Sequence, residues 1–264
     1  MKKTALILLT LVLTACGGGG GGSGTDLSVA TGASIQKVLT QSNSNRVYNS
    51  AVGDINGDGL DDIVVSGWTY DSATAYVWLF TQNTDGTLTD STSLLPTNTI
   101  HGSQHAFIRD FDGDGRNDIF LPGFLDGSTM SKTASIMFWN GVTGFTQQTF
   151  NEPVAAHGAC VDDVNNDGKL DLIVGDGGIY YNQGHRTFTL DSSILQNNWF
   201  SACAVTHQSN GNVNILLGNN YAVAGYRNNI NVYNSSMVFQ NAVGVTSNAN
   251  TDLVEAVAIG KDFA

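Results

Sequence analysis

The sequence predicts an all-β protein, a β-propeller made of repeated four-stranded blades. Three observations lead to this prediction. A nine-residue acidic motif begins at Asp54, Asp110 and Asp163, so its copies are 56 and 53 residues apart. Each copy is followed by a short apolar run and then by a hairpin pattern. Only 13% of the residues are charged and glycine is abundant, a composition that favours strands and turns over long helices.

The three motif copies, at 54–62, 110–118 and 163–171, share one pattern. Oxygen-bearing side chains occupy positions 1, 3, 5 and 9, and glycine occupies position 6. Acids this close repel one another unless a cation neutralises them, and Ca²⁺ accepts about six to eight hard oxygen ligands. We therefore expect about three Ca²⁺ ions, with position 7 contributing its main-chain carbonyl. The expected ligands are Asp54, Asn56, Asp58, Leu60 and Asp62, then Asp110, Asp112, Asp114, Arg116 and Asp118, then Asp163, Asn165, Asp167, Lys169 and Asp171.

EF-hand loops begin in the same way, but they need a glutamate at position 12 and flanking helices. Here position 12 is Val65, Leu121 or Val174. The residues after each loop form short apolar runs rich in β-branched side chains and closed by glycine, a pattern typical of buried strands. The motif is therefore expected to join two strands, with the last acidic ligand at position 9.

A second hairpin completes each unit. Its turns are predicted at 83–86, 140–141 and 182–184, where Asn and Gly allow the positive φ that hairpin turns need. Each unit then has four strands, and such units at a period of roughly 40–50 residues are typical of propeller blades. Within a propeller segment at 28–264, the expected blades are 46–98, 99–152, 153–196 and 197–250, with a partial blade at 251–264.

A fourth copy of the pattern has lost its acids. Uncharged residues stand where ligands would be: Thr206, Gln208, Asn210 and Asn214. This blade is expected to keep its fold without a metal. Residues 257–264 look like the strand before a fifth loop, so we expect about four blades and the start of a fifth, an incomplete propeller. A truncated product without a function is a further alternative.

The loops and their strands resemble FG-GAP repeats, the calcium-loop propeller repeats of integrin α-chains and of many bacterial surface proteins, also grouped as VCBS repeats. The resemblance covers roughly residues 46–264. It implies structural Ca²⁺ and a role in extracellular recognition or adhesion, with a protein or glycan ligand on the blade-loop face. Some members of the family bind or cleave polysaccharides, so a carbohydrate-binding or lyase-type propeller is the alternative.

The N-terminus has the features of an export signal. Basic residues precede an apolar core at 4–13 that is too short to span a membrane. The sequence Leu-Thr-Ala-Cys ending at Cys16 resembles a bacterial lipobox, which predicts a signal peptide at 1–15, lipidation of Cys16 and a Gly-rich tether at 16–27. An ordinary secretory signal with an incidental cysteine is the alternative. Gly17 after the cysteine favours the outer membrane or cell surface.

Two further cysteines, Cys160 and Cys203, each lie three residues before a motif start. They occupy equivalent positions on the inner strands of adjacent predicted blades. An oxidising compartment would allow a disulfide between them, provided that their Cα atoms lie within about 7 Å. A disulfide and two buried thiols both remain open at this point.

The formal net charge is −12, and three Ca²⁺ ions would offset six of these charges. A chain this acidic lacks the basic surface that nucleic-acid binding needs, so no nucleic-acid partner is expected.

No catalytic residue is expected. His105 and His157 are expected on inner strands, where a lone histidine is usually structural, and no Ser-His-Asp order or zinc spacing is present. The carboxylates are accounted for as Ca²⁺ ligands, which leaves no pair for a glycosidase. Aromatic residues such as Trp139 and Tyr180 fit a blade core better than a sugar-stacking surface. We therefore expect a protein that is not an enzyme.

Overall fold

A computed structural model describes most of the region between the N-terminal segment and the C-terminal end. The described residues are 45–69, 75–96, 103–123, 133–150, 156–175, 177–193, 200–219 and 229–244. The chain divides into two units, Met1–Thr31 and Gly32–Ala264, and all described residues belong to the second. The predicted signal peptide at 1–15, Cys16, the tether at 16–27 and the partial blade at 251–264 lie outside the described residues. In the described ranges, no helix has the length and apolar character to cross a membrane.

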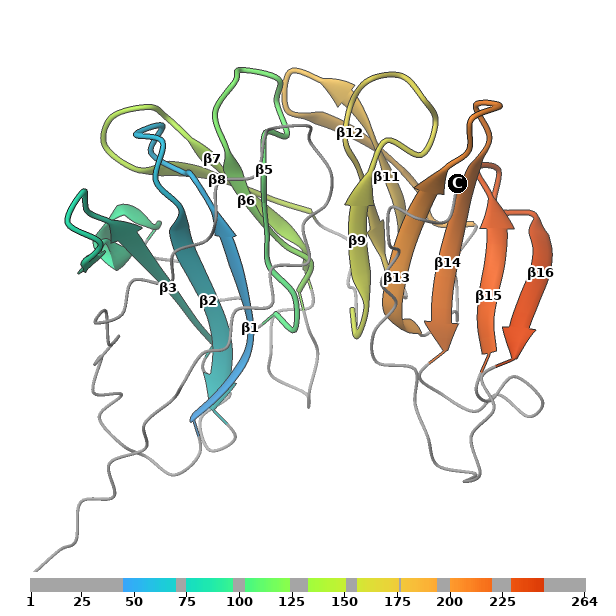
Figure 1. Ribbon diagram of the computed structural model, residues 1–264, viewed down its shortest axis with the longest axis horizontal. Coiled ribbons are helices and arrows are strands. Elements are labelled where there is room, and N and C mark those ends of the chain that lie inside the picture. Colours follow the sequence, from blue (N-terminus) through green and yellow to red (C-terminus); the bar gives the residue numbers. More distant parts are fainter. Residues whose placement is uncertain are drawn as a thin grey trace, which may run out of the picture. The chain divides into compact units, whose positions relative to one another are not determined.

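The described residues form four antiparallel sheets of four strands each, which we call blades 1 to 4 (Figure 1). This confirms the all-β prediction, and the sheets are consistent with propeller blades. In every sheet the strands lie side by side in chain order. Blade 1 contains β1 (Asn45–Gly53), β2 (Asp62–Thr69), β3 (Ala75–Gln82) and β4 (Leu88–Asp90), followed by a short 3₁₀ helix at Thr92–Leu94. Blade 2 contains β5 (Phe107–Arg109), β6 (Asp118–Leu121), β7 (Ser135–Trp139) and β8 (Phe145–Thr149). Blade 3 contains β9 (Ala159–Asp162), β10 (Asp171–Val174), β11 (Gly178–Gly184) and β12 (Thr187–Asp191). Blade 4 contains β13 (Phe200–His207), β14 (Val213–Asn219), β15 (Asn229–Asn234) and β16 (Phe239–Gly244).

The acidic motif joins the first and second strands of blades 1, 2 and 3, as the sequence predicts. Position 9 of the motif is the first residue of the second strand in each case, and it pairs with the last residue of the first strand. In blade 2, for example, Asp118 at the start of β6 pairs with Arg109 at the end of β5. The loops therefore connect neighbouring antiparallel strands rather than helices.

The hydrophobic core lies between successive blades. Ile119 and Leu121 of β6 pack in one cluster with Val64 of blade 1, whereas Phe120 packs in another with Tyr180 of blade 3. Alternate residues of a strand point to opposite faces of its sheet, so β6 is buried on both faces. This explains why the strand after each loop is a continuous apolar run. A third cluster joins blades 3 and 4 in the same way.

One predicted turn is misplaced. The turns at 83–86 and 140–141 are confirmed, with Gly86 and Gly141 at φ 80° and 85°. In blade 3, however, 182–184 belongs to β11, and the turn is made by His185 and Arg186 at φ 50° and 62°. The physical reason is Asn182, whose buried side chain donates to the Phe111 carbonyl of blade 2 and to the Leu170 carbonyl of its own blade, which keeps it in β11.

Blade 4 forms without an acidic loop. In the other blades the pairing of the first two strands ends at the residue before the motif. In blade 4 it continues toward the turn, where Thr206 pairs with Asn214 and His207 with Val213. The remaining residues make a tight turn, in which the Gln208 amide bonds the Asn212 carbonyl at 2.8 Å. The prediction that this sheet keeps its fold is confirmed.

Candidate metal centre

The first aspartate of each motif folds its own loop. In blade 2, Asp110 Oδ1 accepts a hydrogen bond from the Gly113 amide at 2.7 Å, and its Oδ2 accepts one from the Gly115 amide at 2.8 Å. Asp54 accepts the equivalent bonds in the first loop. In the third loop Asp163 Oδ2 accepts the equivalent bond from the Gly168 amide, whereas its Oδ1 accepts from the Asp167 amide of position 5 at 3.0 Å. Gly115 adopts φ 83°, a left-handed conformation that side chains disfavour, which explains glycine at position 6.

Positions 3 and 5 continue this pattern. Asp112 Oδ1 accepts from the Asp114 amide at 3.1 Å, and Asp114 Oδ1 accepts from the Arg116 amide at 2.9 Å. The first and third loops repeat these contacts with Asn56 and Asn165 at position 3. Hydrogen bonds from backbone amides thus orient the side chains of positions 3 and 5 within each loop. The role of the position 7 carbonyls as ligands stays a prediction.

Position 9 has a structural role that the sequence did not reveal. The fully buried Asp118 accepts at Oδ2 from the Phe111 amide of the loop, at 3.0 Å, and at Oδ1 from the Trp139 amide of β7, at 2.9 Å. Asp62 and Asp171 make the same pair of bonds. Each of these carboxylates therefore ties the loop to the second and third strands of its blade.

Burial shifts the acidity of these carboxylates. The pKa of Asp118 is raised to about 7, chiefly because burial desolvates the charged form; the nearby charges of Asp112 and Asp114 also raise it, and its two backbone hydrogen bonds lower it. Desolvation also raises the pKa of Asp171 to about 6 and that of Asp62 above its usual range. A cation in the loop would offset the repulsion among these acids and favour the ionised form.

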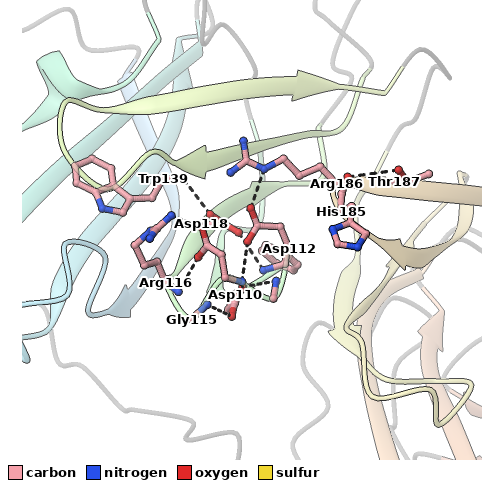
Figure 2. Close-up of polar contacts among 12 residues, drawn as sticks. Asp110, Asp112, Gly115, Arg116, Asp118, Trp139, His185, Arg186 and Thr187 are labelled. Carbon is pink, nitrogen blue, oxygen red and sulfur yellow. Dashed lines mark hydrogen bonds and ion pairs between the residues drawn. The ribbon is translucent and has the colours of Figure 1, made fainter.

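Three carboxylates converge in the second loop. Asp110, Asp112 and Asp118 each place an oxygen within 4.8 Å of the others, a separation at which one ion can contact all three (Figure 2). Among the described residues, this is the one group of at least three His, Cys, Asp or Glu side chains gathered so closely. The oxygen-only donor set and its negative charge fit a hard cation such as Ca²⁺. Asp114, a fourth predicted ligand, is not part of the group and pairs instead with Arg116.

At the predicted ligand positions, the first and third loops hold one carboxylate fewer than the second, because they carry an amide at position 3. In the third loop, Lys169 Nζ lies 2.8 Å from Asp167 Oδ2, which corresponds to the contact between Arg116 and Asp114. In the first loop, position 7 is the uncharged Leu60. The loops therefore share one backbone geometry but differ in the charges around it.

Blade 3 reaches the second loop with two side chains. Asn182 Nδ2 donates to the Phe111 carbonyl at 2.8 Å, and also to the Leu170 carbonyl of its own blade at 3.1 Å. Arg186 donates from Nε to Asp112 Oδ2 at 2.7 Å (Figure 2). The sequence motif did not identify Asn182 or Arg186. Each lies more than 70 positions from its partner in the second loop, and no local sequence pattern marks it.

The histidines are placed differently from the prediction. His105 and His157 precede β5 and β9 rather than lying on these strands. The His105 amide donates to Ser103 Oγ, and its ring Nε2 bonds the His157 carbonyl at 2.9 Å. Both hydrogen bonds therefore lie outside the β-sheet. Burial lowers the pKa of the His105 ring.

Cys160 and Cys203 form a disulfide, with their Cα atoms 5.5 Å apart. It links β9 of blade 3 to β13 of blade 4, which decides between the two alternatives that the sequence left open. Close by, His207 Nε2 bonds Asp162 Oδ1 at 2.8 Å between the same two strands. Because disulfides persist in oxidising compartments, this one points to an extracytoplasmic protein.

Comparison with known proteins agrees with this arrangement over part of the chain. No curated protein matches the sequence. Residues 54–121, which run from the first acidic loop to the end of β6, match the FG-GAP-like repeat family.

Proposed function

We propose that the protein is a calcium-binding recognition or adhesion protein of the bacterial cell envelope, in which Ca²⁺ is structural and the blade loops present a binding surface. The observation that carries this proposal is the convergence of Asp110, Asp112 and Asp118 in a loop whose fold recurs in two other blades. The family match over residues 54–121 supports it.

The geometry favours a structural rather than a catalytic role for these acids. Asp118 already uses both oxygens to hold the loop against β7, and Asp110 uses both to fold the loop. Acid–base catalysis requires a carboxylate that is free to exchange protons with a substrate. A cation here would brace the junction of loop and strands, so we propose that the protein is not an enzyme.

We further propose that Cys16 anchors the protein to the outer membrane or cell surface through attached lipid, with the tether at 16–27 as a spacer. The disulfide supports export. Replacement of Cys16 by Ala should move the protein from the membrane fraction to the soluble fraction and abolish labelling by a radioactive fatty acid. Unchanged labelling would contradict the anchor.

The proposed partner is a protein or a glycan, and nucleic acid is not expected because the net charge is −12. The alternative is a carbohydrate-binding or polysaccharide-cleaving propeller. Trp139 and Tyr180 do not support sugar stacking, because only 5% and 1% of their surfaces are exposed.

Binding of the purified protein to immobilised matrix proteins and glycans, in Ca²⁺ and in chelator, tests the recognition role. We expect binding to at least one surface in Ca²⁺ and its loss in chelator. Absorbance of unsaturated uronate products from pectin-like polymers, abolished by chelation, would instead establish the lyase alternative.

A further inference from the structure

Position 3 distinguishes the second loop from the other two. In all three loops the Oδ1 atom of this residue accepts a hydrogen bond from the amide of position 5, at 2.9–3.1 Å. Asn56 and Asn165 are neutral, and each donates from Nδ2 to the position 5 carboxylate. Asp112 has a charged second oxygen in place of this donor. At position 3, the second loop therefore carries a negative charge that the other two loops lack.

Arg186 of blade 3 neutralises this extra charge. Its Nε lies 2.7 Å from Asp112 Oδ2, and its guanidinium carbon lies 4.5 Å from the centre of the Phe138 ring. The Asp112 side chain is 7% exposed and that of Arg186 is 38% exposed. The Phe138 ring and the Asp112 carboxylate together hold the guanidinium in place. Figure 2 shows Arg186 reaching Asp112 at the candidate metal centre.

We infer that Arg186 is a built-in counter-cation of the second loop, which lowers the Ca²⁺ affinity of this loop and couples its occupancy to the packing of blade 3. This inference rests on the proposed binding of Ca²⁺. Arg186 partly neutralises the Asp112 carboxylate, which Ca²⁺ would use as a ligand. Its positive charge also repels the incoming cation. Without Arg186, the acids of the empty loop would repel one another more strongly, which also favours Ca²⁺ binding.

The size of the effect follows from the surroundings. Asp112, Asp114, His185 and Arg186 line a shallow surface pocket, so solvent screens the guanidinium. A monovalent and a divalent cation about 6 Å apart in a water-like dielectric repel one another enough to change affinity about tenfold. Arg116 and Lys169 occupy equivalent places in the second and third loops, so Arg186 is the feature specific to the second loop.

The test is a Ca²⁺ titration of the full chain, followed by the backbone amide NMR signals of the three position 6 glycines. Gly59, Gly115 and Gly168 each donate to the first aspartate of their own loop and so report on it separately. In the R186Q variant, we expect the midpoint of Gly115 to fall about tenfold while the other two midpoints stay unchanged. An unchanged or higher Gly115 midpoint would overturn the inference.

Three further variants make the test specific. R186K keeps the charge and should keep the wild-type Gly115 midpoint within about threefold. K169Q removes the same charge beside the third loop, so it should move the Gly168 midpoint and not that of Gly115. In a D112N background the guanidinium loses the carboxylate that holds it beside the loop and can move into solvent, so R186Q should change the Gly115 midpoint less than threefold.

Failure of the inference and failure of the proposed function give different results. If no position 6 glycine of the wild-type protein responds to millimolar Ca²⁺, the proposed metal binding is wrong. If all three respond but R186Q behaves as wild type, Ca²⁺ binding stands and only the role of Arg186 is wrong.

Discussion

Loss of the disulfide between Cys160 and Cys203 should destabilise the protein strongly. Blade 4 has no acidic loop, and its first strand is held to blade 3 by this bond together with the contact between His207 and Asp162. The bond spans strands that are distant in sequence. Its main effect in a chain-entropy model is to restrict the unfolded chain.

The expected magnitude follows from the length of the closed loop. The two cysteines are 43 residues apart. For a loop of this size the chain-entropy model gives about 4 kcal/mol at 25 °C. In a protein of this length, each kcal/mol shifts Tm by roughly 2–4 °C, so we expect a decrease of about 8–16 °C.

Urea and thermal unfolding of the C160A/C203A variant, in Ca²⁺, would measure this effect. Wild-type protein treated with a reductant is the control, because it loses the bond without losing side-chain volume. Both samples should unfold at a lower midpoint than the oxidised wild type, with the variant at or below the reduced protein because it also loses buried side-chain volume. Equal stability of oxidised and reduced wild-type protein would refute the reasoning.

Three other predictions concern the loops, the blade contacts and pH. Asp58→Ala and Asp114→Ala should each lower Tm in Ca²⁺ but hardly in chelator, whereas an equal decrease in both would rule out metal ligation. Asn182→Ala should lower the free energy of unfolding by about 1–3 kcal/mol with or without Ca²⁺, because it leaves buried carbonyls unpaired; an effect confined to Ca²⁺ would contradict this. Burial lowers the pKa of His105 below 6.5, so the unfolded chain binds this proton at higher pH than the folded chain does. The stability that the neutral His105 contributes is therefore complete above pH 6.5 and is lost as the pH falls. His105→Gln, which keeps a donor, should reduce this loss as the pH falls below 6.5 in thermal unfolding. An identical pH profile would show that His105 does not contribute.

The sheets were predictable because their signals are local and repeated. The acids of each loop, the glycine at position 6 and the apolar run that follows are all within about twelve residues of one another. The apolar runs also reflect burial on both faces, which the packing of Ile119 and Phe120 against different blades now explains. The cysteines were recognisable as candidate partners because they occupy equivalent places in successive repeats, but the sequence left the choice between a disulfide and two buried thiols open.

The contacts between blades were not predictable from local pattern. Asn182 looked like a turn residue because asparagine tolerates positive φ, yet tertiary hydrogen bonds place it in β11 and move the turn to His185 and Arg186. Asp118 was identified as a ligand from its motif position. Its second role, which holds β7 to the loop, depends on a strand that begins 17 residues later and has no counterpart in the motif.

The central claim is that the acidic loops bind Ca²⁺ and thereby stabilise the blades. Thermal unfolding of the purified protein in about 10 mM Ca²⁺ and in chelator tests it most directly. With dissociation constants of about 10⁻⁴–10⁻³ M, Ca²⁺ at this concentration would stabilise the fold by about 1.4–2.7 kcal/mol for each occupied loop. We predict a cooperative transition that moves to higher temperature in Ca²⁺, whereas identical transitions in the two conditions would contradict the claim.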